Sequence, residues 1–316
     1  MDGVIDFHVH LPWFIKDPVA AAGFLVGEMD RAGVARAVVI AVETSVGKFT
    51  ESIDRRGVVE ALGESMYLFF PSVPGYLNRL IEDLDSALKE HVELLKEHRR
   101  SSLDVVKASE AYKDRLYPVA SFDPDASIEG NIEALRGLEG KIIGLKLLPT
   151  IHFTRPDRRG LFRLYKVLED MGLILIVHTG CDPGVWELPR FCEHARPRYL
   201  VKIAKRFRDL VMVVAHMGSY SALKPGIFMD EAIDLYSRFD NIYVDTSAVD
   251  PFIIEFFVER VGDTSRILFG SDYPYVVGLT ISDAVELIQS LRLTNSIIRG
   301  ILRDNALKLL RNINLI

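Results

Sequence analysis

Val4-Ile5-Asp6-Phe7-His8-Val9-His10 is the stretch of sequence that decides the fold. It is a strand-length run of mostly apolar residues, which suits a parallel strand buried on both faces. His8 and His10 are two residues apart, so on a strand both side chains leave the same face. Asp6 shares their parity and is expected one layer deeper on that face. The stretch therefore predicts a buried strand that ends in a pair of imidazoles.

Apolar segments of the same length recur along the chain and alternate with amphipathic stretches of helical period. The candidate strands are 4–10, 35–42, 116–122, 142–148, 173–178, 211–216, 242–246 and 267–271. The helical stretches are 18–32, 128–138, 160–171, 195–208, 227–238, 251–261 and 282–291, with a last helix over 295–311. This alternation is typical of right-handed βαβ crossovers, and eight of them close most naturally into a (β/α)₈ TIM barrel, an α/β fold.

One domain over residues 1–316 accounts for the length of the chain. Residues 43–115 break the alternation, because a βα connection is normally short, so we predict a helical insertion after the second strand. Apolar residues recur there at helical spacing: Leu77, Leu80, Ile81, Leu84, Leu88, Val92 and Leu95. We favour a helix packed against the barrel wall over a lid on the strand ends, because an apolar stripe usually belongs to the core.

Composition narrows the class of protein. Hydrophobic residues make up 49% and charged residues 26%, the formal net charge is −6, and the charges are interspersed, so we expect no nucleic-acid partner. Apolar runs fall far short of the roughly 20 residues that span a bilayer, and the first residues do not resemble a signal peptide. The two cysteines, Cys181 and Cys192, make no disulfide framework, so we expect a buried thiol at Cys181 and a cytoplasmic enzyme. A homodimer remains open.

Polar residues that can bind metal stand where the predicted strands end. They are His8, His10, Lys146, His178, His216, Asp245 and Asp272. The ends of parallel strands converge on one rim of a barrel, where active sites of this fold lie. Burying so many ionisable groups is costly, and a divalent metal ion is the simplest compensation. Two imidazoles from one strand, a third from another and a carboxylate form a zinc-type ligand set, which also suits iron, manganese or nickel.

Six short motifs carry a resemblance to a known family. They are Ile5-Asp6-Phe7-His8-Val9-His10, Gly144-Leu145-Lys146-Leu147-Leu148-Pro149, Val177-His178-Thr179-Gly180, Ala215-His216-Met217-Gly218, Val244-Asp245-Thr246-Ser247 and Leu268-Phe269-Gly270-Ser271-Asp272-Tyr273-Pro274. The pattern resembles the amidohydrolase superfamily, and within it the amidohydrolase-related branch that includes aminocarboxymuconate semialdehyde decarboxylase. The resemblance implies a distorted barrel and one divalent metal ion, most simply Zn²⁺, on His8, His10, His178 and Asp272. It implies that His216 is a catalytic residue or orients a ligand.

Lys146 leaves alternatives open. In binuclear members of the superfamily, a carboxylated lysine from the fourth strand bridges two metals. Lys146 could instead pair with an anionic substrate, or extend to the rim as an ordinary lysine. The motif around it fits the branch in which one metal is common, so we predict an unmodified Lys146 that contacts substrate and no second metal.

The remaining site residues are assigned by position. His152 and Trp186 lie in predicted rim loops and are expected to contact a small-molecule substrate. Asp6 and Asp245 are expected to orient ligand histidines through hydrogen bonds. Asp272 is expected to take a proton from a water molecule and pass it to the leaving group, with His216 as a hydrogen-bond partner.

The predicted function is a metal-dependent hydrolase of a small amide, ester or lactone-like substrate. The alternative is a non-oxidative decarboxylase of a small unsaturated or aromatic carboxylic acid. That reaction needs a cation for the carboxylate, for which the candidates are Arg155, Arg158, Arg190 and Arg196. A third possibility is a barrel without catalytic activity, whose polar rim binds a small molecule.

Overall fold

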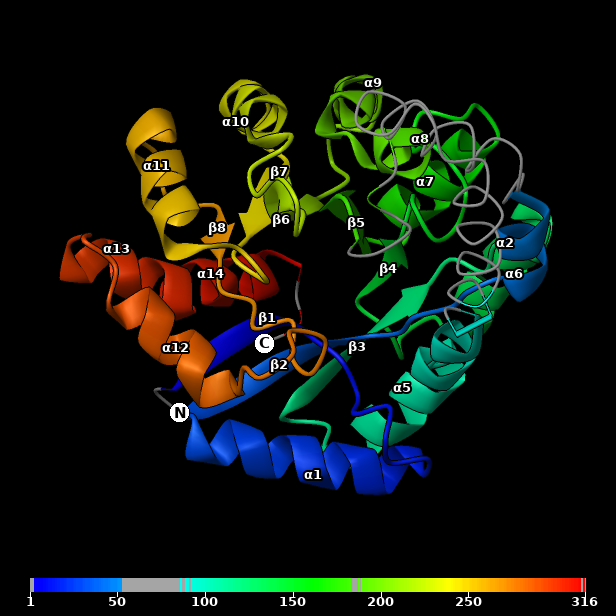
Figure 1. The fold of residues 1–316 in the computed structure, drawn as a ribbon, viewed down its shortest axis with the longest axis horizontal. Coiled ribbons are helices and arrows are strands. Elements are labelled where there is room, and N and C mark those ends of the chain that lie inside the picture. Colours follow the sequence, from blue (N-terminus) through cyan, green and yellow to red (C-terminus); the bar gives the residue numbers. More distant parts are fainter. Residues whose placement is uncertain are drawn as a thin grey trace, which may run out of the picture.

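The fold is a nearly closed ring of parallel strands surrounded by helices (Figure 1). The computed structural model describes residues 3–52, 86, 89, 90, 92–182, 187, 189–313 and 315. Each strand pairs in parallel with the next, in the order β1 Val4–Val9, β2 Val34–Ile40, β3 Leu116–Ser121, β4 Gly144–Leu147, β5 Ile174–Gly180, β6 Met212–Tyr220, β7 Ile242–Asp245 and β8 Ile267–Leu268. The backbone N–H of Phe7 donates to the carbonyl of Phe269 at 2.7 Å and links β1 to the segment after β8. The (β/α)₈ barrel prediction is confirmed.

The helices lie outside the strands. They are α1 Pro18–Arg31, α2 Val46–Ser52, α5 Ser102–Glu110, α6 Ile128–Gly137, α7 Leu161–Asp170, α8 Pro189–Cys192, α9 Val201–Arg206, α10 Met229–Arg238, α11 Pro251–Val261 and α12 Ile281–Gln289. Side chains of Asp17, Ser101 and Thr280 cap α1, α5 and α12 by accepting backbone N–H groups. Short turns η2 Glu193–Ala195 and η3 Pro197–Leu200 precede α9. The helix expected over 295–311 is interrupted, because a π-helical turn η4 Gly300–Asp304 separates α13 Asn295–Arg299 from α14 Asn305–Asn312.

Two apolar clusters make the core. The outer cluster lies between strands and helices and includes Val9 and Leu11. The inner cluster joins the strands to α14 and includes Ile5 and Phe7. Odd-numbered side chains of β1 therefore face the inside of the barrel up to Phe7 and the outside from Val9 on. The change falls in the interval where the β1–β2 register shifts. A bulge of this kind re-aims the side chains that follow it.

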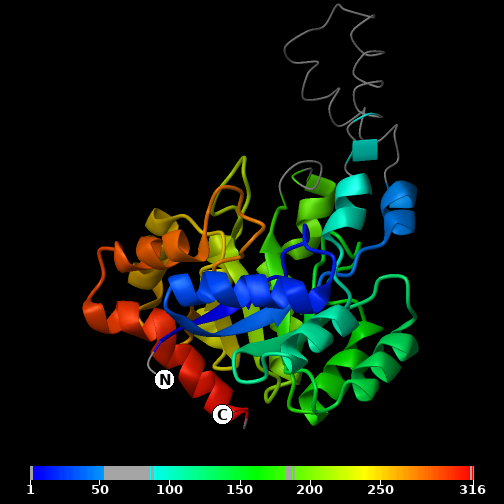
Figure 2. The same ribbon diagram turned by 90° about the horizontal axis from the view of Figure 1, so that it is seen from below.

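Among the described residues of the predicted insertion, the helical residues 92–98 rise above one end of the barrel (Figure 2), whereas α5 packs beside β3 as a barrel helix. An isolated antiparallel bridge between Val42 and Arg100 anchors residues 92–98, with both backbone hydrogen bonds at 2.9 Å. Leu94, Leu95 and His98 line the cavity at the strand ends, so the interpretation as a barrel-wall helix is wrong for these residues. The predicted apolar positions from Leu77 to Leu88 lie outside the described residues.

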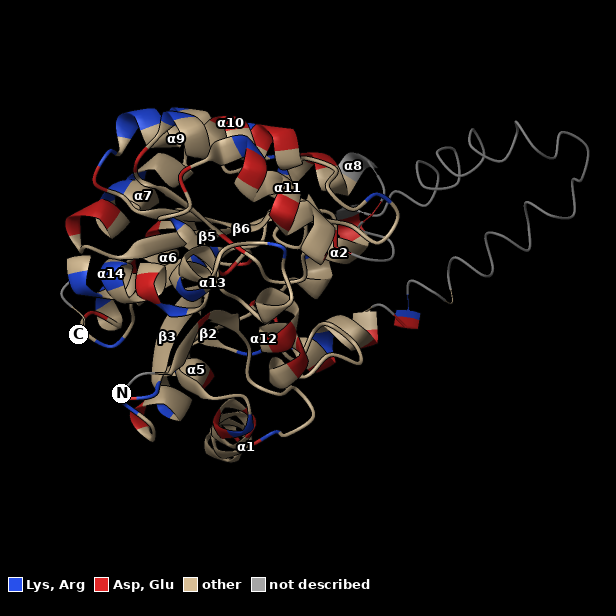
Figure 3. Ribbon diagram, turned by 90° about the vertical axis from the view of Figure 1, so that its left-hand side faces the viewer, with Lys and Arg blue, Asp and Glu red and all other residues tan. Residues whose placement is uncertain are grey.

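Charged residues are spread over the outer helices, with both signs interspersed (Figure 3). Exposed ion pairs such as Lys166–Asp170 and Arg238–Asp234 connect neighbouring turns of one helix. Among the residues described, no helix is both long and apolar enough to cross a membrane.

Candidate metal centre

His8 is held in one orientation at the carboxyl end of β1. Its Nδ1 lies 2.9 Å from Asp245 Oδ2 and 2.9 Å from Ser247 Oγ. A carboxylate only accepts hydrogen bonds, so Nδ1 carries the proton of the neutral ring and Nε2 keeps a free lone pair. That Nε2 lies 3.5 Å from Asp272 Oδ1, inside the barrel mouth.

His10 is oriented in the same sense by a different partner. Its Nδ1 donates to the carbonyl of Ile40 at 2.9 Å, so its Nε2 is also a free acceptor. Nε2 lies 3.4 Å from Asp272 Oδ1. Asp272 has a left-handed backbone with φ 57°, and its N–H donates to the His8 carbonyl at 2.9 Å. Ligand atoms of His8, His10 and Asp272 thus lie within 4.8 Å of one another.

His216 and His178 flank this trio. His216 donates from Nδ1 to the Ser247 carbonyl at 2.9 Å, and its own N–H donates to Asp245 Oδ1 at 3.0 Å. Ring centroids lie 5.0 Å apart for His8 and His216, and 4.6 Å apart for His178 and His216. His178 Nε2 is buried, has no hydrogen-bond partner among the described residues and lies 3.3 Å from Asp182 Oδ2. The structure therefore brings together all four residues of the predicted ligand set, with His178 outside the compact trio.

The donors are in the protonation states that a divalent cation requires. Burial lowers the pKa of His178 to about 3 and that of His216 to about 4, and it holds the pKa of His8 well below its usual range. Burial alone would raise the pKa of Asp272, but the histidines around it hold it well below its usual range. Neutral imidazoles and an ionised carboxylate are ligand forms. Together with the unpartnered His178 Nε2, they fit a metal ion.

Lys146 points into the same cluster. Its side chain is 1% exposed, and its Nζ lies 3.1 Å from His8 Nε2. Burial lowers its pKa to about 8, against the opposing attraction of Asp245 and Asp272. An amine with this pKa loses its proton more readily than an exposed lysine, although it stays mostly protonated near neutral pH.

The residues that were predicted to orient ligands or to contact substrate lie in different surroundings. Asp245 binds the ring of His8, as expected, whereas Asp6 accepts from the backbone N–H groups of His8 and Ser271, both at 3.1 Å. His152 is buried, and both its ring nitrogens bind backbone: Nδ1 accepts from Leu148 N at 3.1 Å and Nε2 donates to Glu43 O at 2.9 Å. Its ring thus braces two loops and has no nitrogen left for a substrate. Trp186 lies outside the described residues.

A cavity of about 450 Å³ opens over the cluster. Residues that sequence analysis did not single out also line it: Asp182, Tyr220 and Tyr275. The Tyr275 ring packs edge-on to His10, with centroids 4.6 Å apart, and its hydroxyl donates to the His98 carbonyl at 2.9 Å. Each of the three follows a strand-end motif by a few residues, which was the available signal. Ser247 was missed as well, although it closes the motif that contains Asp245.

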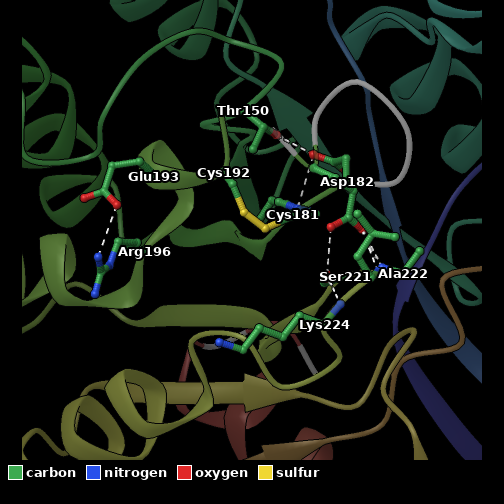
Figure 4. The surroundings of a disulfide bond; sticks show 12 residues. Thr150, Cys181, Asp182, Cys192, Glu193, Arg196, Ser221, Ala222 and Lys224 are labelled. Atoms are coloured by element: carbon green, nitrogen blue, oxygen red, sulfur yellow. Dashed lines mark hydrogen bonds and ion pairs between the residues drawn. A yellow bond between two sulfur atoms is a disulfide. The ribbon is translucent and has the colours of Figure 1, made fainter. Parts of the chain in front are cut away.

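The expectation of a buried thiol at Cys181 is wrong. A disulfide joins Cys181 to Cys192, with their Cα atoms 4.8 Å apart (Figure 4). The chain leaves β5 at Gly180 and returns through α8, which brings the second cysteine back to the strand end. The bond thus closes a loop directly beside Asp182.

Comparisons with known proteins agree with this fold. The model of the amidohydrolase family matches residues 5–311. An uncharacterised TIM-barrel protein from Bordetella bronchiseptica is 18% identical with a TM-score of 0.67, covering 98% of this chain and 99% of that one. A probable 2-pyrone-4,6-dicarboxylic acid hydrolase from Acinetobacter baumannii, with citric acid bound, and 5-carboxyvanillate decarboxylase from Sphingomonas paucimobilis are each 14% identical, with a TM-score of 0.61 and the same coverage.

No curated protein matches at the sequence level. The solved structures are too distant in sequence to show more than the fold, whereas the family model spans almost the whole chain. The conclusion that follows from the strand-end residues and from this match is that the chain belongs to the amidohydrolase family, whose enzymes depend on metal.

Proposed function

We propose that this enzyme hydrolyses a small amide, ester or lactone-like substrate at one divalent metal ion. The observation that supports this most is the convergence of His8 Nε2 and His10 Nε2 on Asp272 Oδ1, at 3.5 and 3.4 Å. With His178, these residues would hold the ion, and nitrogen and oxygen donors of this kind favour Zn²⁺ while also suiting manganese, iron or nickel. A bound divalent cation lowers the pKa of a water molecule and polarises a carbonyl group.

Two side chains would move or hold the proton. Asp272 is kept ionised by its histidine neighbours, so it can accept a proton from the attacking water and return it to the leaving group. His216 is fixed by its Nδ1–H bond to Ser247, which leaves Nε2 free to accept a hydrogen bond. In this position it can hold the attacking water molecule in place.

The charges around the cavity favour hydrolysis of an uncharged molecule. Among the described residues that line it, Lys146 is the only lysine or arginine. Arg155 pairs with Asp157, and Arg196 pairs with Glu193 and Glu231, so both are engaged elsewhere. The side chain of Arg190 lies outside the described residues.

Decarboxylation is the second candidate, and Lys146 is the observation that favours it. A buried amine within 3.1 Å of His8 could hold a substrate carboxylate if it keeps its proton. The 5-carboxyvanillate decarboxylase with the same fold shows that this architecture accommodates such a reaction.

Metal analysis of the full-length protein, followed by a divided substrate screen, tests the proposal. We expect about one divalent ion per chain, and turnover of amides, esters or lactones without release of carbon dioxide. Carbon dioxide released from aromatic or dienoic acids would establish the second candidate instead. A protein that binds no divalent metal at micromolar concentration would refute both.

A further inference from the structure

Asp182 is a carboxylate in the cavity wall to which the proposed mechanism gives no role. It stands two residues after the end of β5, and its side chain is 16% exposed. The Thr150 hydroxyl donates a hydrogen bond to it, as Figure 4 shows. Its Oδ2 also lies 3.3 Å from Nε2 of His178, which has no hydrogen-bond partner among the described residues. Asp182 therefore borders the metal-binding residues without belonging to the His8–His10–Asp272 trio.

The backbone around Asp182 is fixed on both sides. The N–H of Cys181 donates to the carbonyl of Tyr220, and the Cys181–Cys192 disulfide closes the following loop. Gly180 has φ 107°, and a Cβ there would lie 2.3 Å from the Tyr220 carbonyl oxygen, so this close approach requires glycine. A carboxylate positioned in this way is oriented before any ligand arrives.

The carboxylate can accept more hydrogen bonds than the described residues donate to it. An ionised carboxylate offers about four acceptor positions. Within the described residues, the Thr150 hydroxyl is the hydrogen-bond donor that the structure supplies to it. A ligand N–H group facing the cavity would supply the missing compensation.

We infer that Asp182 determines substrate specificity by accepting a hydrogen bond from an N–H group next to the reacting carbonyl. This rests on the proposed function and narrows it: the substrates are uncharged amides, including lactams. Esters and lactones lack the N–H donor, so they leave the carboxylate without its partner. A substrate carboxylate at the same position is repelled.

A matched pair of metal-binding probes tests the inference without knowledge of the natural substrate. Acetohydroxamate carries an N–H next to its carbonyl, and N-methylacetohydroxamate carries a methyl group there. Binding of each to the zinc-loaded, full-length protein is measured by titration calorimetry. We expect the wild type to bind the N–H probe about ten-fold more tightly, as befits a hydrogen bond to a charged group.

Variants separate a hydrogen bond from steric exclusion of the methyl group. Asp182→Ala should bring the ratio of affinities close to one, and the nearly isosteric Asp182→Asn should reduce it without changing the space available. Glu193→Gln, a carboxylate paired with Arg196 after the same loop, should keep the wild-type ratio. Zinc content and melting temperature of each variant establish that it is folded and loaded.

The outcomes distinguish this inference from the proposed function. Equal affinities for the two probes in the wild type, or an unchanged ratio in Asp182→Ala, would overturn the role of Asp182 and leave the metal centre intact. A zinc-loaded wild type that binds neither probe would show that the metal ion is not open to a ligand in this cavity, and it would overturn the proposed function and this inference together.

Discussion

Nδ1 of His8 and Oδ2 of Asp245 lie 2.9 Å apart, although 237 positions separate the two residues in sequence. The contact joins β1 to β7 across the barrel mouth. The same carboxylate accepts the backbone N–H of His216 through its other oxygen, at 3.0 Å. Asp245 therefore fixes the ring of one strand-end histidine and the backbone of another, which makes it the organising residue of the cluster.

Asp245→Asn should weaken metal binding by about 10- to 100-fold, because an amide orients the His8 ring less well and makes Nε2 a poorer donor. Competitive titration against a chromophoric chelator measures the change. Asp240→Asn removes an exposed carboxylate before β7 and should bind metal as the wild type does. An unchanged affinity in Asp245→Asn would contradict the assigned role.

Asp272→Asn should lower turnover by about 10²- to 10⁴-fold, because the amide cannot accept a proton from water. The far-UV circular dichroism spectrum should stay that of the wild type, since Asp272 lies in a loop and not within a strand. Glu286→Gln, on the exposed face of α12, is the control. Full activity of the Asp272 variant on the identified substrate would refute the hydrolytic mechanism.

The positions of the strand-end residues could be predicted because parallel strands all end at one rim. The orientations could not. Asp6 was expected on the face of His8, but the shift in β1 register breaks the two-residue period, and its carboxylate binds backbone instead. His216 and Asp272 have positive φ values of 62° and 57°, a conformation that no periodicity in sequence reveals.

Contacts made by loops were predictable only in part. His152 is near the rim, as its place after the fourth strand suggested, but its two backbone partners come from different loops. The Cys181–Cys192 pair depends on the return of α8 toward β5, and sequence spacing does not determine that path. Such features arise from tertiary packing and not from local pattern.

His152 should make stability depend on pH in the acid range. Burial lowers the pKa of folded His152 to about 3 from the ordinary histidine value of 6.5, so the unfolded chain binds more protons between these values. Its contribution to the free energy of unfolding is thus complete above pH 6.5 and is lost as pH falls toward 3, by several kcal/mol in total. Denaturant titrations of the wild type and His152→Gln between pH 5 and 7 should diverge with pH. A constant difference would show that His152 titrates normally.

Tyr275→Phe should loosen the described end of the insertion. The variant loses the hydroxyl that donates to the His98 carbonyl at 2.9 Å, a bond of about 1 kcal/mol that holds residues 92–98 over the cavity. Hydrogen exchange of the amides in 92–98 should accelerate several-fold. Tyr273→Phe is the matched control, because that ring packs against the outer cluster. Equal hydrogen-exchange rates in the two variants would contradict the role of the Tyr275 hydroxyl in holding residues 92–98.

The disulfide gives the last prediction. Wild-type protein unfolded without reductant should show no reactive thiol, and Cys192→Ser should show one. Because the bond closes a short loop, its loss should lower the free energy of unfolding by about 3 kcal/mol, measured by denaturant titration. The same variant should retain the zinc content of the wild type, since neither cysteine belongs to the ligand set. Two reactive thiols in the unfolded wild type would contradict the pairing. Among the described contacts, the Cys181–Tyr220 backbone hydrogen bond and the Thr150 hydroxyl would then hold the segment that carries Asp182.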